Sequence, residues 1–404
     1  MLKNFSELLK KKSTIWFGIF FLVNIFYALT RHSVDFYQFW LISRNAIFVP
    51  GYDIYYVNTD FSQPIFFFCL VSAFSVFTYK TALFFWNIMQ MLLVIFTVIL
   101  SSRIMGFGER YDGGWNEGKH LKSGNYVLPL ALGAVIICDN LWLGQANILS
   151  FFLCVAAIYN HLKERSWAVG LFLALAISVK LTPVLFLIYF LYKKDYEVLP
   201  WTLFGRDYFR LVIMPFANNA VAIRGTTGFW HSNQSIDGFL GRHFTDFGKN
   251  HYGGLHNIID PANFTLVQIK KIGLLLKSAL VLFAAFSFTN SKNKNPQLLK
   301  FEYALMFLLI LFLSPASWLN HFVTVFFAYY AAANYIRDSS GSYYGRIVMK
   351  IGLTAGFALA ALSSFNSFTQ SYSGMFLGHF ILLLTLFIIL FIEKSRTHKT
   401  WQPI

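Results

Sequence analysis

Long apolar runs separated by short polar or charged stretches dominate the chain. They cover residues 15–29, 148–159, 167–179, 183–192, 272–288, 322–333, 347–365 and 376–392, among others. Many approach the roughly 20 residues that a helix needs to cross a bilayer, once their aromatic ends are counted. Backbone N–H and C=O groups in hydrocarbon must bond within their own segment, so we predict that these runs are helices.

Two regions admit more than one assignment. Residues 63–103 are long enough for two helices with Lys80 between them, yet the charge bias requires one net crossing, so we expect one half to be re-entrant. At 198–216, charged residues interrupt the apolar pattern, and an interfacial helix competes with a span. We predict an all-α polytopic membrane protein with 11 to 13 spans, forming a single integral membrane domain over residues 1–404.

The composition agrees with a membrane protein. Of the 404 residues, 56% are hydrophobic and only 13% are charged, which is more apolar than ordinary soluble domains. The net charge of +15 does not indicate nucleic-acid binding, because the basic residues form short clusters between apolar runs. Cys69, Cys138 and Cys154 lie within apolar runs and are interpreted as small core residues rather than disulfide or zinc partners.

The distribution of basic residues predicts the orientation in the membrane. If the amino terminus is cytoplasmic, 20 of the 33 Lys and Arg residues fall in cytoplasmic clusters, whereas the outward loops hold five: Arg31, Arg44, Arg224, Arg242 and Lys249. This asymmetry obeys the positive-inside rule and places both termini in the cytoplasm. The basic start and the run at 15–29 are interpreted as an uncleaved first helix, because no small-residue cleavage site follows.

Two long outward segments, residues 31–62 and 218–263, are expected to be irregular loops that carry function. The second contains seven glycines and four histidines (His231, His243, His251 and His256), without the spacing of a metal pair. Its basic residues suit solvated charges better than phosphate contacts. The sequons at Asn233 and Asn263 are expected to be accessible. Residues 106–125 are interpreted as a solvated connector.

Group transfer from a lipid-linked donor needs a base, a cation near the leaving phosphate, and a cavity shared by lipid and water. Asp35 follows the first helix, with Arg31 and His32 before it, and is that base, a helix cap or a surface charge. Asp139 is a second carboxylate, which leaves a metal between the two acids open. The reaction itself requires no cofactor.

Further polar residues appear where the chain turns on the same predicted side. Gln145 and Asn147 either bind sugar hydroxyls or satisfy a turn. Lys180 either holds a lipid phosphate or extends to the interface. His321, in the turn that also holds Trp318, either contacts the donor phosphate or is structural.

Taken in order, several segments resemble glycosyltransferase family 87. They are the Asp-Phe pair at Asp35, residues 51–55, Gly144-Gln145-Ala146-Asn147, Lys180 with Pro183, and Ser314-Pro315 with Trp318 and His321. Gln63-Pro64 and Leu319-Asn320 depart from the family pattern. The resemblance implies that Asp35 is the catalytic aspartate, that Lys180 and His321 bind the donor phosphate, and that Gln145, Asn147 and Trp318 bind or position the sugar.

The resemblance also implies a GT-C-type helical bundle and an inverting transfer from a polyprenyl-phosphate sugar, commonly mannose, to a glycan or glycolipid acceptor. The active site would face the non-cytoplasmic side of a membrane, expected to be the bacterial inner membrane. Three rivals remain open: a transporter or flippase of lipid-linked sugars, an O-antigen ligase or polymerase, and a non-catalytic scaffold.

Overall fold

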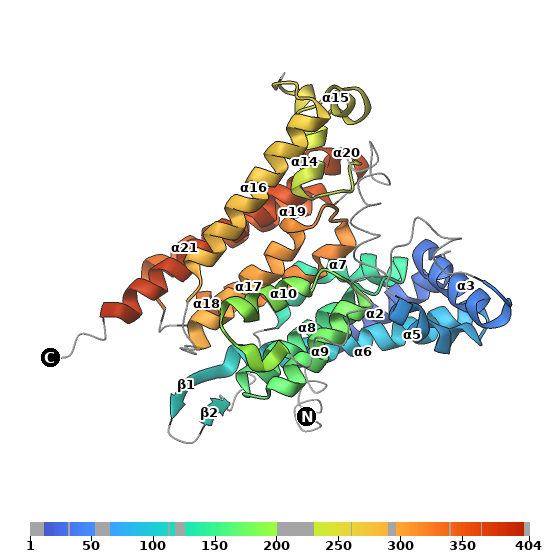
Figure 1. Cartoon of the computed structure of the whole chain (residues 1–404), viewed down its shortest axis with the longest axis horizontal. Coiled ribbons are helices and arrows are strands. Elements are labelled where there is room, and N and C mark those ends of the chain that lie inside the picture. The colour runs from blue at the N-terminus through green and yellow to red at the C-terminus, as the bar shows by residue number, and fades with distance from the viewer. Residues whose placement is uncertain are drawn as a thin grey trace.

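The computed structural model describes residues 12–30, 33–52, 65–111, 114–117, 126–199, 230–259, 261–289, 296–338, 341–364 and 366–399. Within these ranges the chain is almost entirely helical (Figure 1), which confirms the predicted all-α class. A small antiparallel hairpin, β1 (Phe107–Tyr111) with β2 (Gly114–Glu117), lies in the connector after α6.

The helices follow the apolar runs closely. The amino-terminal half contains α2 (Lys12–Thr30), α3 (Val34–Phe48), α5 (Ile65–Ser75), α6 (Tyr79–Gly106), α7 (Val127–Leu143), α8 (Asn147–Leu162), α9 (Ser166–Val179), α10 (Val184–Tyr192) and the 3-10 turn η1 (Tyr196–Val198). The second half contains α14 (Ile236–His243), α15 (Asp246–Tyr252), η4 (Gly254–Asn257), α16 (Leu266–Ser287), α17 (Pro296–Leu313), η5 (Leu319–Thr324), α18 (Val325–Arg337), α19 (Tyr343–Ser363), α20 (Ser367–Ser371) and α21 (Gly374–Lys399).

The core is centred on α17 and its neighbour α18. Every residue from Leu298 to Phe312 is buried, so α17 is covered on all sides, as expected for a helix that is apolar almost all round. Phe307 of α17 stacks edge-on against Phe151 of α8 and Phe186 of α10, with ring centroids 5.1 Å apart in both pairs. This packing joins α8, α10 and α17 beside the polar residues described below.

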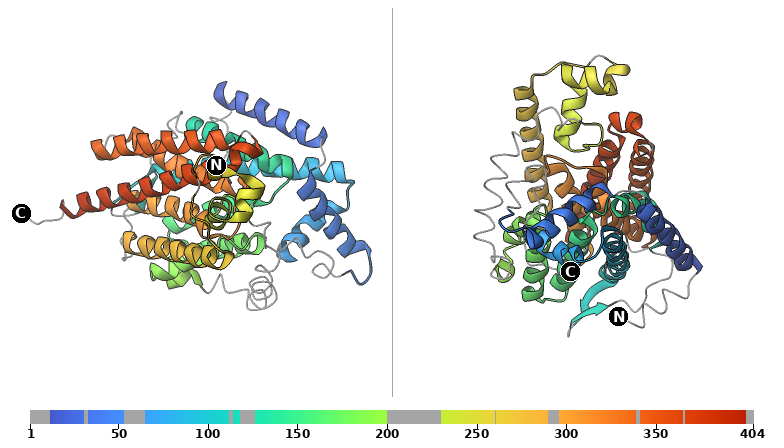
Figure 2. Two further views of the ribbon diagram at one scale, coloured as in Figure 1. Left: turned by 90° about the horizontal axis from the view of Figure 1, so that it is seen from above. Right: turned by 90° about the vertical axis from the view of Figure 1, so that its right-hand side faces the viewer.

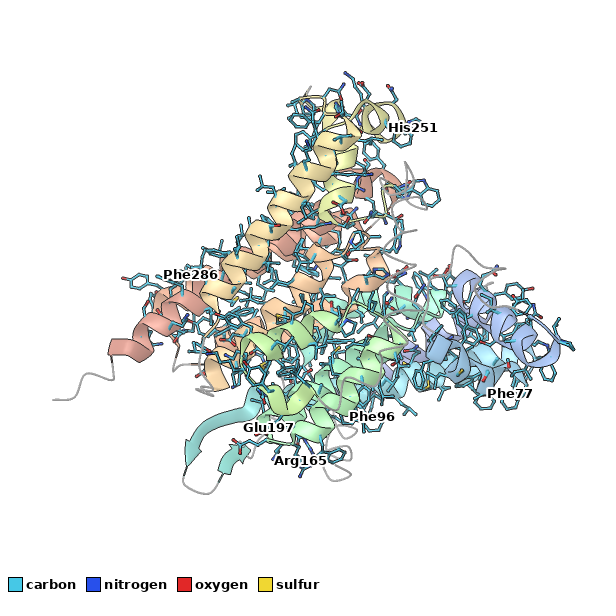
Figure 3. The ribbon with its side chains drawn as sticks, viewed as in Figure 1. Phe77, Phe96, Arg165, Glu197, His251 and Phe286 are labelled. Atoms are coloured by element: carbon cyan, nitrogen blue, oxygen red, sulfur yellow. The ribbon has the colours of Figure 1, made fainter. Side chains whose placement is uncertain are left out.

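The periphery, by contrast, is apolar and exposed. On α16, Leu275 is 70% exposed, Leu282 71% and Phe286 80% (Figure 3). Soluble monomers seldom expose apolar side chains along a whole helix face, whereas lipid is a suitable solvent for them. The exposed faces therefore agree with an integral membrane protein.

Three helical segments in the described part of the chain are long and apolar enough to cross a membrane: Tyr79–Gly106, Tyr343–Ser363 and Gly374–Arg396. Four shorter apolar helices, Phe66–Ser75, Val127–Leu143, Asn147–Leu162 and Ser166–Val179, accompany them. The number of 11 to 13 spans stays a prediction.

Two of the long helices, α19 and α21, lie side by side in every view (Figures 1 and 2). Their backbones approach closely at Gly356 and Gly378, where a Cβ added to Gly356 would lie 2.6 Å from the Gly378 carbonyl oxygen. Small residues at such a crossing are typical of helix pairs in membranes.

The two segments expected to be irregular loops contain helices where they are described. α3 occupies most of the described part of the first, and α14, α15 and η4 lie in the second. The expectation of irregular loops was wrong. In the second segment, capping side chains start α14 and α15: Ser235 and Thr245 accept hydrogen bonds from the N–H groups of Gly238 and Gly248. Residues 53–62 and 218–229 lie outside the described residues, as do Arg31, His32, Arg224, Gln63-Pro64 and nearly all of 198–216.

Residues 63–103 contain two helices, as their length predicted, with the break at residues 76–78 rather than at Lys80. α5 has 11 residues and rises about 16 Å, roughly half the hydrocarbon thickness of a bilayer. Its shortness agrees with one net crossing in this region. Cys69 on α5 is exposed, so its interpretation as a core residue was wrong, whereas Cys138 and Cys154 are buried.

Candidate active site

The turn between α7 and α8 is fixed from several sides. Gly144 adopts a left-handed conformation with φ of +66°, and an added Cβ would collide with Phe36 of α3. Two buried side chains of α6 bind the turn's carbonyl groups: Trp86 Nε1 donates to Gly144 O at 2.9 Å, and Gln90 Nε2 donates to Gln145 O at 2.8 Å. The side chains that leave this turn therefore start from a rigid base.

Asp35 lies in the first turn of α3, which is docked onto α6. The Ser33 N–H donates to Tyr79 Oη at 2.9 Å, and the Phe36 ring stacks on Trp86 with centroids 5.3 Å apart. Gln145 Nε2 donates to Asp35 Oδ2 at 2.5 Å, so the turn and the carboxylate are joined directly. Burial raises the pKa of Asp35, while the Gln145 hydrogen bond and the positive charge of Lys180 partly oppose this rise.

Lys180 caps the carboxyl end of α9, where the backbone becomes extended. Its Nζ donates to Oδ1 of Asn147, the first residue of α8. Burial lowers the pKa of Lys180 to about 7, although the negative charge of Asp35 opposes this shift. The same turn therefore binds the Asp35 carboxylate through Gln145 and the Lys180 ammonium through Asn147.

A pocket opens beside this ammonium. Its walls come from α8, the turn after α9, α17, the turn after α17, and η5; they comprise Asn147, Ser150, Lys180, Thr182, Ile310, Leu311, Ser314, Ser317, His321 and Thr324. Three predicted site residues, Asn147, Lys180 and His321, thus line one pocket. Trp318 is half-buried at the start of η5 and is absent from the pocket lining, as are Asp35 and Gln145.

Two histidines of the second long segment, His243 and His251, have structural surroundings. His243 is fully buried; its Nε2 lies 3.0 Å from Ser373 Oγ, and its Nδ1 accepts a hydrogen bond from the Leu255 N–H at 3.1 Å. His251 stacks on Phe247 at the surface (Figure 3). Among the described residues, no three His, Cys, Asp or Glu side chains are grouped so as to hold a metal ion.

Two expectations for the same segment were wrong. Arg242 is fully buried rather than solvated, and its guanidinium donates to the carbonyl oxygens of Trp230 and Asn233 at 2.5 and 2.6 Å. The sequon residue Asn233 is also fully buried, and its Oδ1 accepts from the Ser317 N–H at 3.0 Å. The other sequon residue, Asn263, is exposed as expected, and so is Lys249. Both errors arose because tertiary packing covers polar residues that a local pattern places at the surface.

Asn140 and Asn320 were missed as site residues. Both are buried beside Asn147, and Asn147 Nδ2 donates to Asn140 Oδ1 at 3.0 Å and to Asn320 Oδ1 at 3.2 Å. Asn140 had a detectable signal, because an amide within an apolar helix is costly unless it has a partner. Asp139 precedes it and interacts electrostatically with Asp35.

Comparisons with known proteins give a consistent family. The model of Glycosyltransferase family 87 matches residues 61–315, a range that includes Gln145, Asn147 and Lys180 but not Asp35 or His321. A polyprenol-phosphate-mannose-dependent alpha-(1-2)-phosphatidylinositol mannoside mannosyltransferase of Mycolicibacterium smegmatis is 30% identical over 131 residues, covering 29% of this chain and 28% of the relative.

The protein of the same name from Mycobacterium tuberculosis is 24% identical over 200 residues, covering 49% of this chain and 43% of the relative. The chain therefore spans less than half the length of either relative. No solved structure matches it.

Proposed function

The chain belongs to glycosyltransferase family 87, and on this premise we propose that it transfers a hexose from a polyprenyl-phosphate donor to a glycan or glycolipid acceptor with inversion. Mannose is the hexose that the relatives' names favour, and the same names support a glycolipid acceptor. We propose that the protein carries out this transfer as an integral membrane enzyme.

One observation carries the proposal. The Gly144-to-Asn147 turn bonds the Asp35 carboxylate through Gln145 and the Lys180 ammonium through Asn147, beside a pocket that His321 also lines. A base and a cation held on one rigid turn are the groups that glycosyl transfer from a phosphate requires.

We assign Asp35 as the base. Its carboxylate takes the proton of an acceptor hydroxyl as that oxygen forms a bond to the anomeric carbon. The bond between this carbon and the phosphate oxygen breaks on the opposite face of the sugar, so the configuration inverts. Burial raises the pKa of Asp35, which strengthens it as a base while it stays ionised above that pKa.

The leaving group is polyprenyl phosphate, which carries its own negative charge and needs no general acid. Lys180 and His321, which both line the pocket, are the groups we assign to this phosphate. A cation in a partly dehydrated site stabilises the departing charge more strongly than it would in water. Glycosidases, by contrast, use a second carboxyl group for this step.

Gln145 and Asn147 then act as positioning residues, because each already donates to or accepts from a charged group of the site. Trp318 is proposed to contact the sugar from the adjacent turn. The site is proposed to face the non-cytoplasmic side of the bacterial inner membrane, with both termini cytoplasmic, on the strength of the 20-to-five distribution of basic residues.

The test is transfer by the purified protein. It is incubated in detergent or vesicles with a panel of radiolabelled polyprenyl-phosphate hexoses and short glycan and glycolipid acceptors, and products are separated by chromatography. We expect transfer of a single hexose, preferentially mannose. Movement of intact lipid-linked sugar across vesicles without transfer would support a flippase instead, and transfer of whole oligosaccharides would support a ligase or polymerase.

A further inference from the structure

Three buried asparagines form a group behind the Lys180 ammonium. Asn140 lies near the end of α7, Asn147 begins α8, and Asn320 belongs to η5; their exposed fractions are 0%, 4% and 5%. Only Asn147 lines the pocket. Buried amides destabilise a protein unless they are hydrogen-bonded, so the pattern of bonds among them reveals what the group holds in place.

The orientation of the Asn140 amide is determined by two backbone carbonyl groups. Its Nδ2 donates to Ile136 O at 2.9 Å and to Asn320 O at 2.8 Å. A carbonyl oxygen only accepts, so the NH₂ group of Asn140 must face these two atoms. Oδ1 of Asn140 is then directed the other way, toward Asn147, where it must accept.

The orientation of Asn140 in turn determines the orientation of the Asn147 amide. Asn147 Nδ2 donates to Asn140 Oδ1 at 3.0 Å, with Asn320 O and Oδ1 at 3.3 and 3.2 Å. Its Oδ1 therefore faces Lys180 Nζ and accepts from it. If Asn147 flipped, its carbonyl oxygen would face the acceptors of Asn140 and Asn320, and its NH₂ group would face the ammonium.

We propose that Asn140 and Asn320 are positioning residues, which hold the Asn147 amide so that its carbonyl oxygen, and not its NH₂ group, binds Lys180. The role of Lys180 as a phosphate ligand rests on the proposed function, whereas the hydrogen-bond chain does not. A neutral acceptor holds the ammonium without cancelling its charge, so the charge stays available to an anion. A carboxylate in place of Asn147 would neutralise it.

The experiment uses Asn140→Leu, which keeps the side-chain volume and removes both donors and the acceptor. Purified protein is treated with an amine-acylating reagent, and the modification rate of the peptide that contains Lys180 is followed by mass spectrometry. Without the hydrogen bond from Asn147 to Asn140, the Asn147 amide holds Lys180 less firmly, and modification of Lys180 should be about 2- to 12-fold faster. The KM for the polyprenyl-phosphate donor should rise by a similar factor, with a smaller change in kcat.

Asn160→Leu is the matched control. Asn160 Nδ2 donates to Ala156 O at 2.9 Å, four residues earlier in its own helix, as Asn140 does to Ile136, but it is remote from the asparagine group. This variant should leave the Lys180 modification rate and the donor KM unchanged. A purely structural effect of losing a helix amide would instead appear in both variants.

Asn320→Ala is the milder second variant, because it removes one acceptor of Asn147 and keeps the backbone carbonyl. Its melting curve in detergent shows whether it is folded, and a modification rate between native and Asn140→Leu is expected. Native rates at Lys180 in both folded variants would overturn the proposal. If the variants are modified faster at Lys180 but the native protein itself transfers no hexose, the proposed function is refuted and the positioning role is left intact.

Discussion

Two lysines stand at the two ends of α10 and have opposite surroundings. Before the helix, Lys180 donates a hydrogen bond to the amide of Asn147, and its hydrogen-bonded connection to Asp35 runs through the turn at Gln145. After the helix, Lys193 pairs directly with the fully buried Glu302 at 2.9 Å. Both sites contain a cation and an acid, but only the second joins them.

The Lys193 pair is completely satisfied. Lys193 Nζ also donates to Thr289 O and Oγ1, each at 2.7 Å, and the Glu302 carboxylate accepts from Tyr189 Oη at 2.7 Å and from the Thr289 N–H at 2.8 Å. All three N–H donors of Lys193 and both carboxylate oxygens of Glu302 have partners, so neither side chain has hydrogen-bonding capacity left for a substrate. Amides that separate two charges thus keep these charges chemically available, whereas direct pairing makes them structural.

Replacing the proposed base should have the largest effect. Asp35→Asn keeps the shape and removes most of the basicity, so turnover should fall about 10²- to 10⁴-fold, as for loss of a general base. Donor binding and melting should match the native protein. The measurement is single-turnover transfer of a labelled sugar, and native-like turnover in the variant would remove Asp35 from the mechanism.

Breaking the other pair should affect folding rather than chemistry. Glu302→Leu leaves the buried Lys193 ammonium without its carboxylate, and removal of one partner from such a pair costs about 3–5 kcal/mol. We expect a lower melting midpoint and yield in detergent. The double variant with Lys193→Met should regain most of the loss, because both charges are gone; a single variant as stable as native would show that the pair is not structural.

Removing the pocket ammonium should weaken donor binding. For Lys180→Met we expect donor affinity to fall about 10- to 100-fold, the size of one charge-assisted hydrogen bond, with folding retained. The measurement is binding of labelled polyprenyl phosphate. Lys270→Met removes the same charge from an exposed position on α16 and serves as the control. Equal affinity in both variants would exclude Lys180 from the phosphate site.

The smallest effect is expected in the pH dependence of transfer. Asp35 must be ionised, so kcat/KM should fall as pH drops through its raised pKa. Lys180 must be protonated, and its pKa of about 7 means that the ammonium is lost as pH rises through that value. The profile should therefore be bell-shaped. Lys180→Arg keeps its charge at all these pH values and should lose the alkaline limb.

The apolar runs alone determined the helical class, because a backbone in hydrocarbon has few other ways to satisfy its N–H and C=O groups. Order along the chain also identified Asp35, Gln145, Asn147, Lys180 and His321 as candidates. Helix starts within the second long segment were hidden, since Ser235 and Thr245 act as caps only through backbone geometry that a glycine-rich pattern obscures.

Which of these candidate side chains contact one another depends on the packing of helices that are distant in the sequence. Asn140 and Asn320 are separated by 180 residues yet meet at 2.8 Å, and no local pattern reports such a contact. Likewise, Lys180 and Lys193 each lie next to an apolar helix in the sequence, and only the packing of α8 and α17 gives one an amide and the other a carboxylate. Residue types set which groups are present, but distances between distant segments set which charges are free to act.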